Sequence, residues 1–256
     1  ISFKYDYTLV ILSFVVASWI PLYFRWRLLC KNLGLEIPFR SDFLVYLAGL
    51  ALYITPAKLG ELLRSQILRE KFGIQRTQTT PLLFIEKFYD LLGAVIASSI
   101  GILYFPQIGI IVLGGLIISI VIFVIFSSKI TFDKSIILLS KFKFSKKFIE
   151  PLSKSHEILK TSTKIKIFTP SVILSVLNWV TISFAVFYVL KALNIESLGF
   201  PEIVSTYASS LFLGALSFLP GGLGITEGSF VGLLNIQGID LATGVVVVII
   251  IRLFTL

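Results

Sequence analysis

Long runs without a charged residue constrain the fold of this chain more than any other feature of its sequence. Residues 91–128 form an uncharged run of 38 residues, and residues 7–24 and 167–190 form uncharged runs of 18 and 24 residues. A helix needs about 20 apolar residues to cross the hydrocarbon core of a bilayer. The runs therefore predict an all-α, polytopic membrane helix bundle in the cell membrane. The expected crossings are Tyr7–Phe24, Pro81–Tyr104, Ile108–Phe126, Ile167–Leu190 and a last one that begins at Leu241.

Composition supports a membrane protein and argues against other functions of a basic chain. Hydrophobic residues make up 56% of the sequence and charged residues only 14%, whereas a soluble domain carries about 25% charged residues. The net charge of +9 resides in loops beside apolar runs, so we expect membrane lipids as partners and no nucleic acid. Cys30 is the only cysteine and His156 the only histidine. They provide neither a disulfide nor a zinc ligand set, and we expect no metal and no cofactor.

Two stretches that lie 164 positions apart share one pattern: an apolar run, then Pro-x-x-Leu-Gly, then a carboxylate. A broken apolar helix that recurs in two halves of a chain is typical of a transporter binding site. We therefore predict that residues 43–70 and 203–235 form two re-entrant hairpins. The alternative is that the prolines are ordinary kinks in spanning helices. The residues expected to break the helices are Pro56, Gly60, Pro220, Gly221, Gly222 and Gly224.

Basic residues predict the orientation of the chain in the membrane. Residues 129–166 contain ten lysines against three acidic residues, which places this loop in the cytoplasm. Three crossings then separate the first span from the span at 167–190, so the halves 7–126 and 167–256 are predicted to be inverted repeats. If residues 43–57 cross the membrane instead of re-entering, the repeats run parallel. We expect 1–256 to be a single transmembrane domain, trimmed at both ends.

Apolar residues are interleaved with the lysines of the loop 129–166. This pattern is typical of basic amphipathic helices on an anionic membrane surface, here the inner leaflet. The alternative is a solvated loop that only sets the topology. In either case we expect His156 to lie in a polar loop. A second basic segment, Arg25-Trp26-Arg27, follows the first span and fits an interface anchor on the cytoplasmic side.

Charged residues at membrane depth cost at least about 2 kcal/mol each, so they are usually paired and functional. Glu61 lies in the first turn after the Pro56 break, where a carboxylate complements the positive helix end, and Arg64 lies within its reach. The alternative is that Glu61–Arg64 and Glu86–Lys87–Asp90 are ion-pair struts at the inner interface. We favour the strut for Lys87 because a lysine near a helix end can snorkel. The predicted substrate-binding residues are Glu61, Arg64, Glu86, Asp90, Glu227 and Arg252.

The motifs around these charges resemble the transmembrane region of the lysylphosphatidylglycerol synthase family, a flippase-like domain. Across roughly residues 10–255, four family motifs occur in order. One of them departs from the family pattern, because Lys87 stands where the family has an arginine. The resemblance implies lipid handling without aminoacyl transfer, since no soluble acyltransferase domain accompanies the spans. The motifs are Arg25-Trp26-Arg27, Pro56 to Arg64, Glu86 to Asp90, and Pro220 to Glu227.

The sequence leaves three functions to compare. The leading one is an integral membrane lipid translocator for a phospholipid or a polyprenyl-phosphate-linked lipid, with Arg64, Glu227 and Arg252 converging on one polar cavity. The second is a membrane-embedded transferase that acts on a lipid phosphate, which is less favoured because the chain has no Asp-x-Asp motif for a divalent metal. The third is a non-transporting subunit that docks a cytosolic partner on the loop 129–166. An enzyme is therefore less expected than a carrier, and a homo-oligomer is left open.

Overall fold

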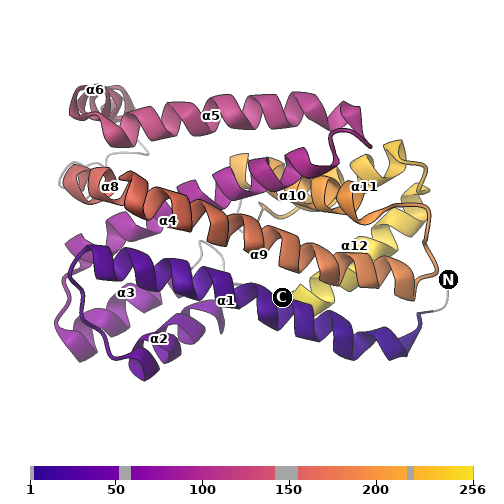
Figure 1. Ribbon diagram of the computed structural model, residues 1–256, viewed down its shortest axis with the longest axis horizontal. Coiled ribbons are helices and arrows are strands. Elements are labelled where there is room, and N and C mark those ends of the chain that lie inside the picture. Colours follow the sequence, from indigo (N-terminus) through magenta and orange to yellow (C-terminus); the bar gives the residue numbers. More distant parts are fainter. Residues whose placement is uncertain (1–2, 52–58, 142–154, 218–221, 256) are drawn as a thin grey trace. The chain divides into compact units, whose positions relative to one another are not determined.

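The structure, a computed structural model, describes residues 3–51, 59–141, 155–217 and 222–255. Within these residues every regular element is a helix and no strand occurs. This confirms the predicted all-α membrane helix bundle (Figure 1). The α-helices are α1 (Thr8–Asn32), α2 (Phe39–Ala51), α3 (Leu59–Phe72), α4 (Arg76–Ser98), α5 (Gly109–Ser127), α6 (Lys129–Ser140), α8 (His156–Ser162), α9 (Ile165–Ala192), α10 (Phe200–Leu216), α11 (Ile225–Ile236) and α12 (Leu241–Thr255).

Three stretches of the described chain are helical, long and apolar enough to cross a membrane: Tyr5–Asn32, Pro106–Ser127 and Ile165–Ala192. They contain 28, 22 and 28 residues, which at 1.5 Å per residue exceeds the hydrocarbon core of about 30 Å. Only 22% to 33% of their most apolar windows is buried inside the protein. Their outward apolar side chains are therefore suited to contact lipid, as an integral membrane protein requires.

The chain divides into two compact units, which are described separately. The divisions fall within the helices α1, α4, α5 and α9, so they do not coincide with the boundaries predicted for the two repeats. Unit 1 comprises Ile1–Leu22, Leu91–Leu116 and Ile173–Leu256, and unit 2 comprises Tyr23–Asp90 and Ile117–Val172.

Unit 1 is held together by an apolar core between the start of α1 and the helices α9 to α12. Ile11, Leu234 and Val247 are fully buried in this core, and Val186 is nearly so. Aromatic rings extend the contact, with Phe14 of α1 stacked on Phe184 of α9 at 5.0 Å between ring centroids. The core thus fixes α10 and α11, the helices that precede and follow the second Pro-x-x-Leu-Gly stretch.

The stretch 203–235 is not one straight helix, because α10 ends at Leu216 and α11 begins at Ile225. The two helices pack closely at glycines: a Cβ atom on Gly214 would lie 1.8 Å from Thr226 Oγ1. Gly222 and Gly224 have φ angles of +67° and +83°, a conformation that favours glycine. These two glycines thus lie in the predicted break, whereas Pro220 and Gly221 fall outside the described residues. That these two helices form a re-entrant hairpin stays a prediction.

In the corresponding stretch of unit 2 the structure describes α2 and α3, and residues 52–58 between them lie outside the described part. Pro56 lies outside the described residues, and Gly60 is the second residue of α3. α3 ends just before a glycine: Gly73 has φ +67°, and its amide donates to the carbonyl of Arg69 at 3.0 Å. This is the left-handed glycine cap that commonly ends helices.

The predicted start of a helix at Pro81 was wrong, because α4 begins at Arg76 and includes the polar residues 76–80. The hydroxyls of Ser65 in α3 and Thr79 in α4 are buried and lie 2.6 Å apart in a hydrogen bond. Thr79 in the polar first turn of α4 therefore packs against α3, whereas Arg76, Thr77 and Gln78 of the same turn are exposed. Periodicity alone does not reveal such a contact between two neighbouring helices.

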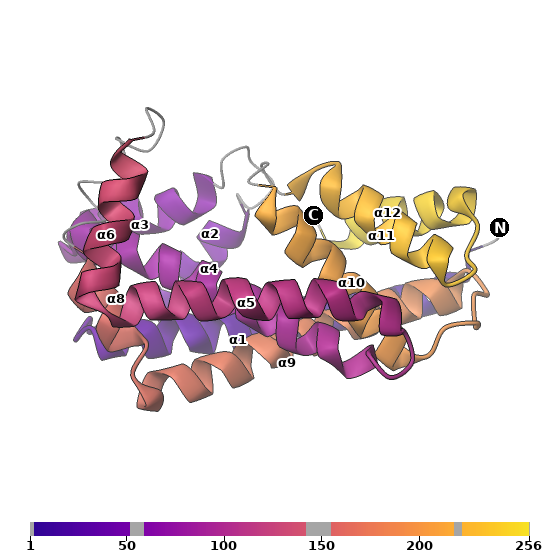
Figure 2. The same ribbon diagram turned by 90° about the horizontal axis from the view of Figure 1, so that it is seen from above.

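The basic loop contains two described helices, α6 and α8, and its residues 142–154 lie outside the described part. α6 runs crosswise to the adjoining end of α5 in both views (Figures 1 and 2). The expectation that His156 lies in a polar loop was wrong: its imidazole is buried in α8, 4.9 Å from the ring of Phe132 in α6. Apolar packing between α6 and α8 explains the burial.

Candidate functional site

The first group of charged residues lies in unit 2, where α4 binds two other helices through ion pairs. Glu86 of α4 pairs with Arg64 of α3, and Asp90, one turn further along, pairs with Arg25 of α1 at 2.7 Å. Lys87 also reaches Asp90, at 3.4 Å, and remains 35% exposed. Glu86 and Asp90 therefore fasten α3 and α1 to one helix. Arg25 and Arg64 are almost fully buried, at 2% and 6% exposed.

An indole ring supports the Arg64 side of this group. The guanidinium carbon of Arg64 lies 3.9 Å from the ring centroid of Trp26, a geometry in which cation and aromatic face attract each other. The Trp26 ring is fixed in turn, because its Nε1–H donates to Asp42 at 2.9 Å. Arg27 also pairs with Asp42, at 3.1 Å. A connected chain of contacts therefore runs from α2 through α1 to α3 and α4.

The segment Arg25-Trp26-Arg27 was predicted to anchor the protein at the membrane interface, and for two of its residues this was wrong. Arg25 and Trp26 are 2% and 1% exposed and point into unit 2. The reason is that α1 does not end at Phe24 but continues to Asn32, so these residues lie on a helix packed against α2 and α4. Asp42 was also missed from the sequence as a member of this group of charged residues. The signal that could have identified it is a lone carboxylate in the first turn of an apolar segment.

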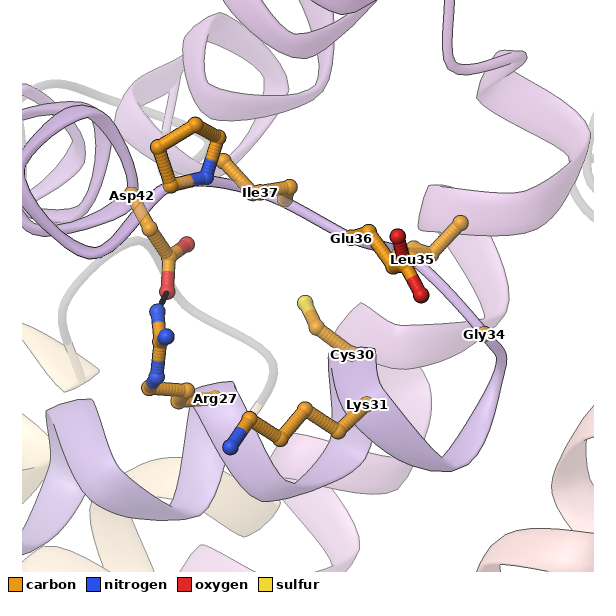
Figure 3. Close-up of a pocket in the computed structure, with 9 residues that line it drawn as sticks. Arg27, Cys30, Lys31, Gly34, Leu35, Glu36, Ile37 and Asp42 are labelled. Atoms are coloured by element: carbon orange, nitrogen blue, oxygen red, sulfur yellow. Dashed lines mark hydrogen bonds and ion pairs between the residues drawn. The ribbon is translucent and has the colours of Figure 1, made fainter.

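A cavity of about 530 Å³ opens beside this group in unit 2. Its walls come from the last turns of α1, the link to α2, and the first turn of α2 (Figure 3). Both basic and acidic side chains line it. The lining residues are Arg27, Cys30, Lys31, Gly34, Leu35, Glu36, Ile37, Pro38 and Asp42.

The second group of charged residues lies in unit 1, at the start of α11. Glu227 forms an ion pair with Arg252 of α12, and its other carboxylate oxygen accepts a hydrogen bond from the amide of Gly224 at 2.7 Å. One carboxylate thus caps α11 and neutralises an arginine on an apolar helix. Both side chains stay partly exposed, Arg252 at 22% and Glu227 at 24%.

A small cavity of about 20 Å³ adjoins the Glu227–Arg252 pair, which is room for about one water molecule. Thr226 lines it, and its buried hydroxyl has no hydrogen-bond partner among the described residues. Tyr207 and Ser210 add two more hydroxyls to the lining. Three hydroxyl groups therefore lie beside this ion pair, among the apolar side chains that line the rest of the cavity.

The structure joins the predicted residues in pairs. It brings Glu227 to Arg252 and Glu86 to Arg64, while Asp90 meets Arg25, which was not among the predicted site residues. The Glu61 side chain lies outside the description. The convergence of the two arginine pairs on one cavity stays a prediction. Within the described ranges, no group of three or more His, Cys, Asp or Glu residues could hold a metal ion.

Comparisons with known proteins agree with this membrane architecture. Residues 2–256 match the family described as lysylphosphatidylglycerol synthase TM region. The chain is also 27% identical, over 214 residues, to the UPF0104 membrane protein MJ1078 of Methanocaldococcus jannaschii, an alignment that covers 79% of this chain and 86% of the relative. No solved structure matches the chain. Since the match extends over nearly its whole length, the chain belongs to the lysylphosphatidylglycerol synthase TM region family.

Proposed function

We propose that this protein is a multi-pass protein of the cell membrane that moves a lipid with a phosphate group, either a phospholipid or a polyprenyl-phosphate-linked lipid, between leaflets. The observation that carries the proposal is the Glu227–Arg252 pair: a partly exposed arginine and carboxylate on apolar helices beside a Gly-rich break. Ionised groups in such surroundings are costly and mark pathways through membrane proteins.

Arg252 is suited to bind a lipid phosphate. A guanidinium presents parallel N–H donors that match two phosphate oxygens, and Arg252 is 22% exposed. In the described state it binds Glu227 instead. A lipid phosphate would replace that carboxylate, so binding is an exchange of partners and no arginine is left unpaired in an apolar environment.

Glu227 makes this exchange less costly. Its second oxygen holds the amide of Gly224, so the carboxylate keeps a hydrogen bond and the favourable end of the helix dipole after Arg252 leaves. An unpaired buried carboxylate without such a partner would be strongly unfavourable. We therefore assign Glu227 the role of returning Arg252 to its resting position once the lipid has passed.

The order of elements supports the predicted repeats. In each half a long helix, α1 or α9, is followed by two shorter described helices. α2 and α3 occupy these places in the first half, and α10 and α11 in the second. This agreement supports two interrupted hairpins that line a lipid pathway, and we propose that they are inverted with respect to each other.

We propose the anionic inner leaflet as the partner of α6. This helix lies crosswise to the end of the apolar helix α5 (Figure 2), and it exposes Ile130 at 70% and Ile137 at 63% beside Lys129 and Lys134. An exposed apolar side with flanking lysines fits the surface of an anionic membrane.

Replacing both isoleucines with aspartate should raise α6 toward water in depth measurements with a spin label, and an unchanged depth would refute the contact.

Lipid movement in reconstituted vesicles tests the proposed function. Purified protein should accelerate the exchange of a labelled phospholipid or a labelled polyprenyl phosphate between leaflets. Glu227→Gln, which keeps an oxygen for the Gly224 amide but removes the charge, should slow it, because a neutral amide attracts the Arg252 guanidinium less strongly and so returns it to its resting position less well. Glu70→Gln, on an exposed residue of α3, is the matched control. Wild-type vesicles that move neither lipid faster than empty vesicles would overturn the proposal.

A further inference from the structure

The cavity at the end of α1 is built by the way that helix ends. Gly34 has φ +70°, its amide donates to the carbonyl of Lys31 at 3.0 Å, and the amide of Leu35 donates to that of Cys30 at 3.1 Å. This pair of bonds is a Schellman cap, which turns the chain back over the last helical turn. The link to α2 thereby turns back beside the end of α1, and the two segments border a half-open cavity of about 530 Å³, within the range of small-molecule sites.

Two cations of α1 face this cavity. Arg27 and Lys31 are one turn apart and both line it, and like charges at this spacing repel each other. Arg27 is held by Asp42 at 3.1 Å, which fixes one side of its guanidinium fork. Lys31 is exposed and forms no ion pair within the described ranges of the chain. An anion between the two would relieve the repulsion and bind several N–H donors at once.

A separate carboxylate lines the cavity from the link. Glu36 is exposed, and among the described residues it forms no ion pair. Figure 3 shows it across the cavity from Arg27, with the Cys30 sulfur between the two walls. The other acidic residue, Asp42, is already engaged by Trp26 and Arg27. The free acidic group therefore lies apart from the two basic groups.

We propose that this cavity binds a zwitterionic head group that carries a phosphate and a primary amine. The phosphate lies between Arg27 and Lys31, and the ammonium group binds Glu36. The buried apolar side chains of Leu35 and Ile37 line the carbon part of the ligand. The inference rests on the proposed function in one respect, namely that the head group belongs to a membrane lipid, since α1 is long enough to span a bilayer and the cavity lies at its end.

Cys30 provides a direct readout of occupancy. It is the only cysteine of the chain, and it lines the cavity although it is only 2% exposed. Slow alkylation by N-ethylmaleimide, followed by mass spectrometry of the intact protein, therefore reports on this place alone. Glycerophosphoethanolamine, used as a soluble probe on the full chain in detergent, should slow the alkylation about fivefold or more at saturation. Glycerophosphate should protect more weakly, and ethanolamine alone should not protect.

Two variants separate the two halves of the site. Lys31→Ala should raise the probe concentration needed for protection about tenfold, the size of one charge-assisted hydrogen bond. Glu36→Gln should retain protection by glycerophosphate and remove the advantage of the amine. Lys71→Ala and Glu70→Gln, exposed residues of α3 away from the cavity, are the matched controls. Equal protection of wild type and Lys31→Ala would overturn the site.

Nanodiscs distinguish a lipid from a soluble ligand of the same chemistry. Phosphatidylethanolamine should protect Cys30, whereas phosphatidylcholine, which lacks a primary amine, should not. Protection by the soluble probe alone would assign the site to a metabolite and refute the lipid source. If wild-type Cys30 proves too slow to alkylate, native mass spectrometry of lipid bound to the wild type and to Glu36→Gln replaces it, and equal occupancy overturns the inference. If the protein moves lipid but no probe protects Cys30, this site is refuted and the proposed function stands. If the probe protects Cys30 but the protein moves no lipid, the site stands and the proposed function is refuted.

Discussion

Two arginine–carboxylate pairs of the same chemistry have different environments in this protein. Arg64–Glu86 in unit 2 is nearly fully buried, and Trp26 covers the guanidinium. Arg252–Glu227 in unit 1 is partly exposed, and Glu227 also accepts a hydrogen bond from the amide of Gly224. Breaking the first pair leaves a buried charge without compensation, whereas breaking the second does not. The comparison shows one pair that joins two helices inside unit 2, and we propose that the other pair exchanges Glu227 for a lipid phosphate.

The largest effect should follow from Arg64→Ala. It leaves Glu86 buried without its partner, which typically costs about 3–5 kcal/mol, and it also removes the contact with Trp26. We expect a clear fall in the thermal unfolding temperature in detergent. Arg64→Met combined with Glu86→Leu should recover most of the loss, because the uncompensated charge is gone. An Arg64→Ala protein with wild-type stability and no lipid movement would instead assign Arg64 to the substrate, as the sequence predicted.

A somewhat smaller loss is expected from Gly214→Ala in the other region. The new methyl group would meet Thr226 Oγ1 at 1.8 Å, so α10 and α11 must separate, at a cost of about 1–3 kcal/mol. Denaturation monitored by circular dichroism measures the effect. Adding Thr226→Ala should restore part of the stability. Gly228→Ala, where a Cβ meets nothing within 4 Å, is the control and should be close to neutral.

The smallest effect concerns pH and the start of α12. Hydrogen bonds from the Thr243 side chain and backbone amide lower the pKa of Asp240, whose carboxylate accepts the amide at 3.0 Å. A depressed folded-state pKa means that the contribution to stability is present above the unfolded value of about 3.9 and is lost as the pH falls through the lower folded value. Asp240→Asn should weaken this pH dependence below pH 4, and identical acid profiles of the two proteins would contradict it.

Much of the fold could be predicted because apolar runs specify membrane helices directly. The helices around 108–126 and 167–190 and the glycine cap at Gly73 follow from local sequence. The inward position of Arg25 could not be predicted, since it depends on α1 continuing past Phe24 and on an acidic partner 65 positions away in the chain.

The candidate site was predictable as a set of residues but not as a set of pairs. Glu227 and Arg252 stand out because each is a charge beside apolar runs. Their pairing requires the packing of α11 on α12, which follows from the core of unit 1 and not from any motif. The same limit applies to Arg64, whose ion pair with Glu86 and contact with Trp26 depend on the packing of α3 against α1 and α4; its contact with substrate stays a prediction.

The exchange at Arg252 is tested most directly by lipid movement and stability measured on the same preparations. Arg252→Ala should slow lipid movement in vesicles about tenfold or more while changing stability by less than about 1 kcal/mol, as for a partly exposed ion pair. Arg252→Lys should recover only part of the rate, because a lysine lacks the two parallel donors of the guanidinium. Arg69→Ala, an exposed arginine of α3, should leave both quantities unchanged. Wild-type lipid movement by a stable Arg252→Ala protein would contradict the account.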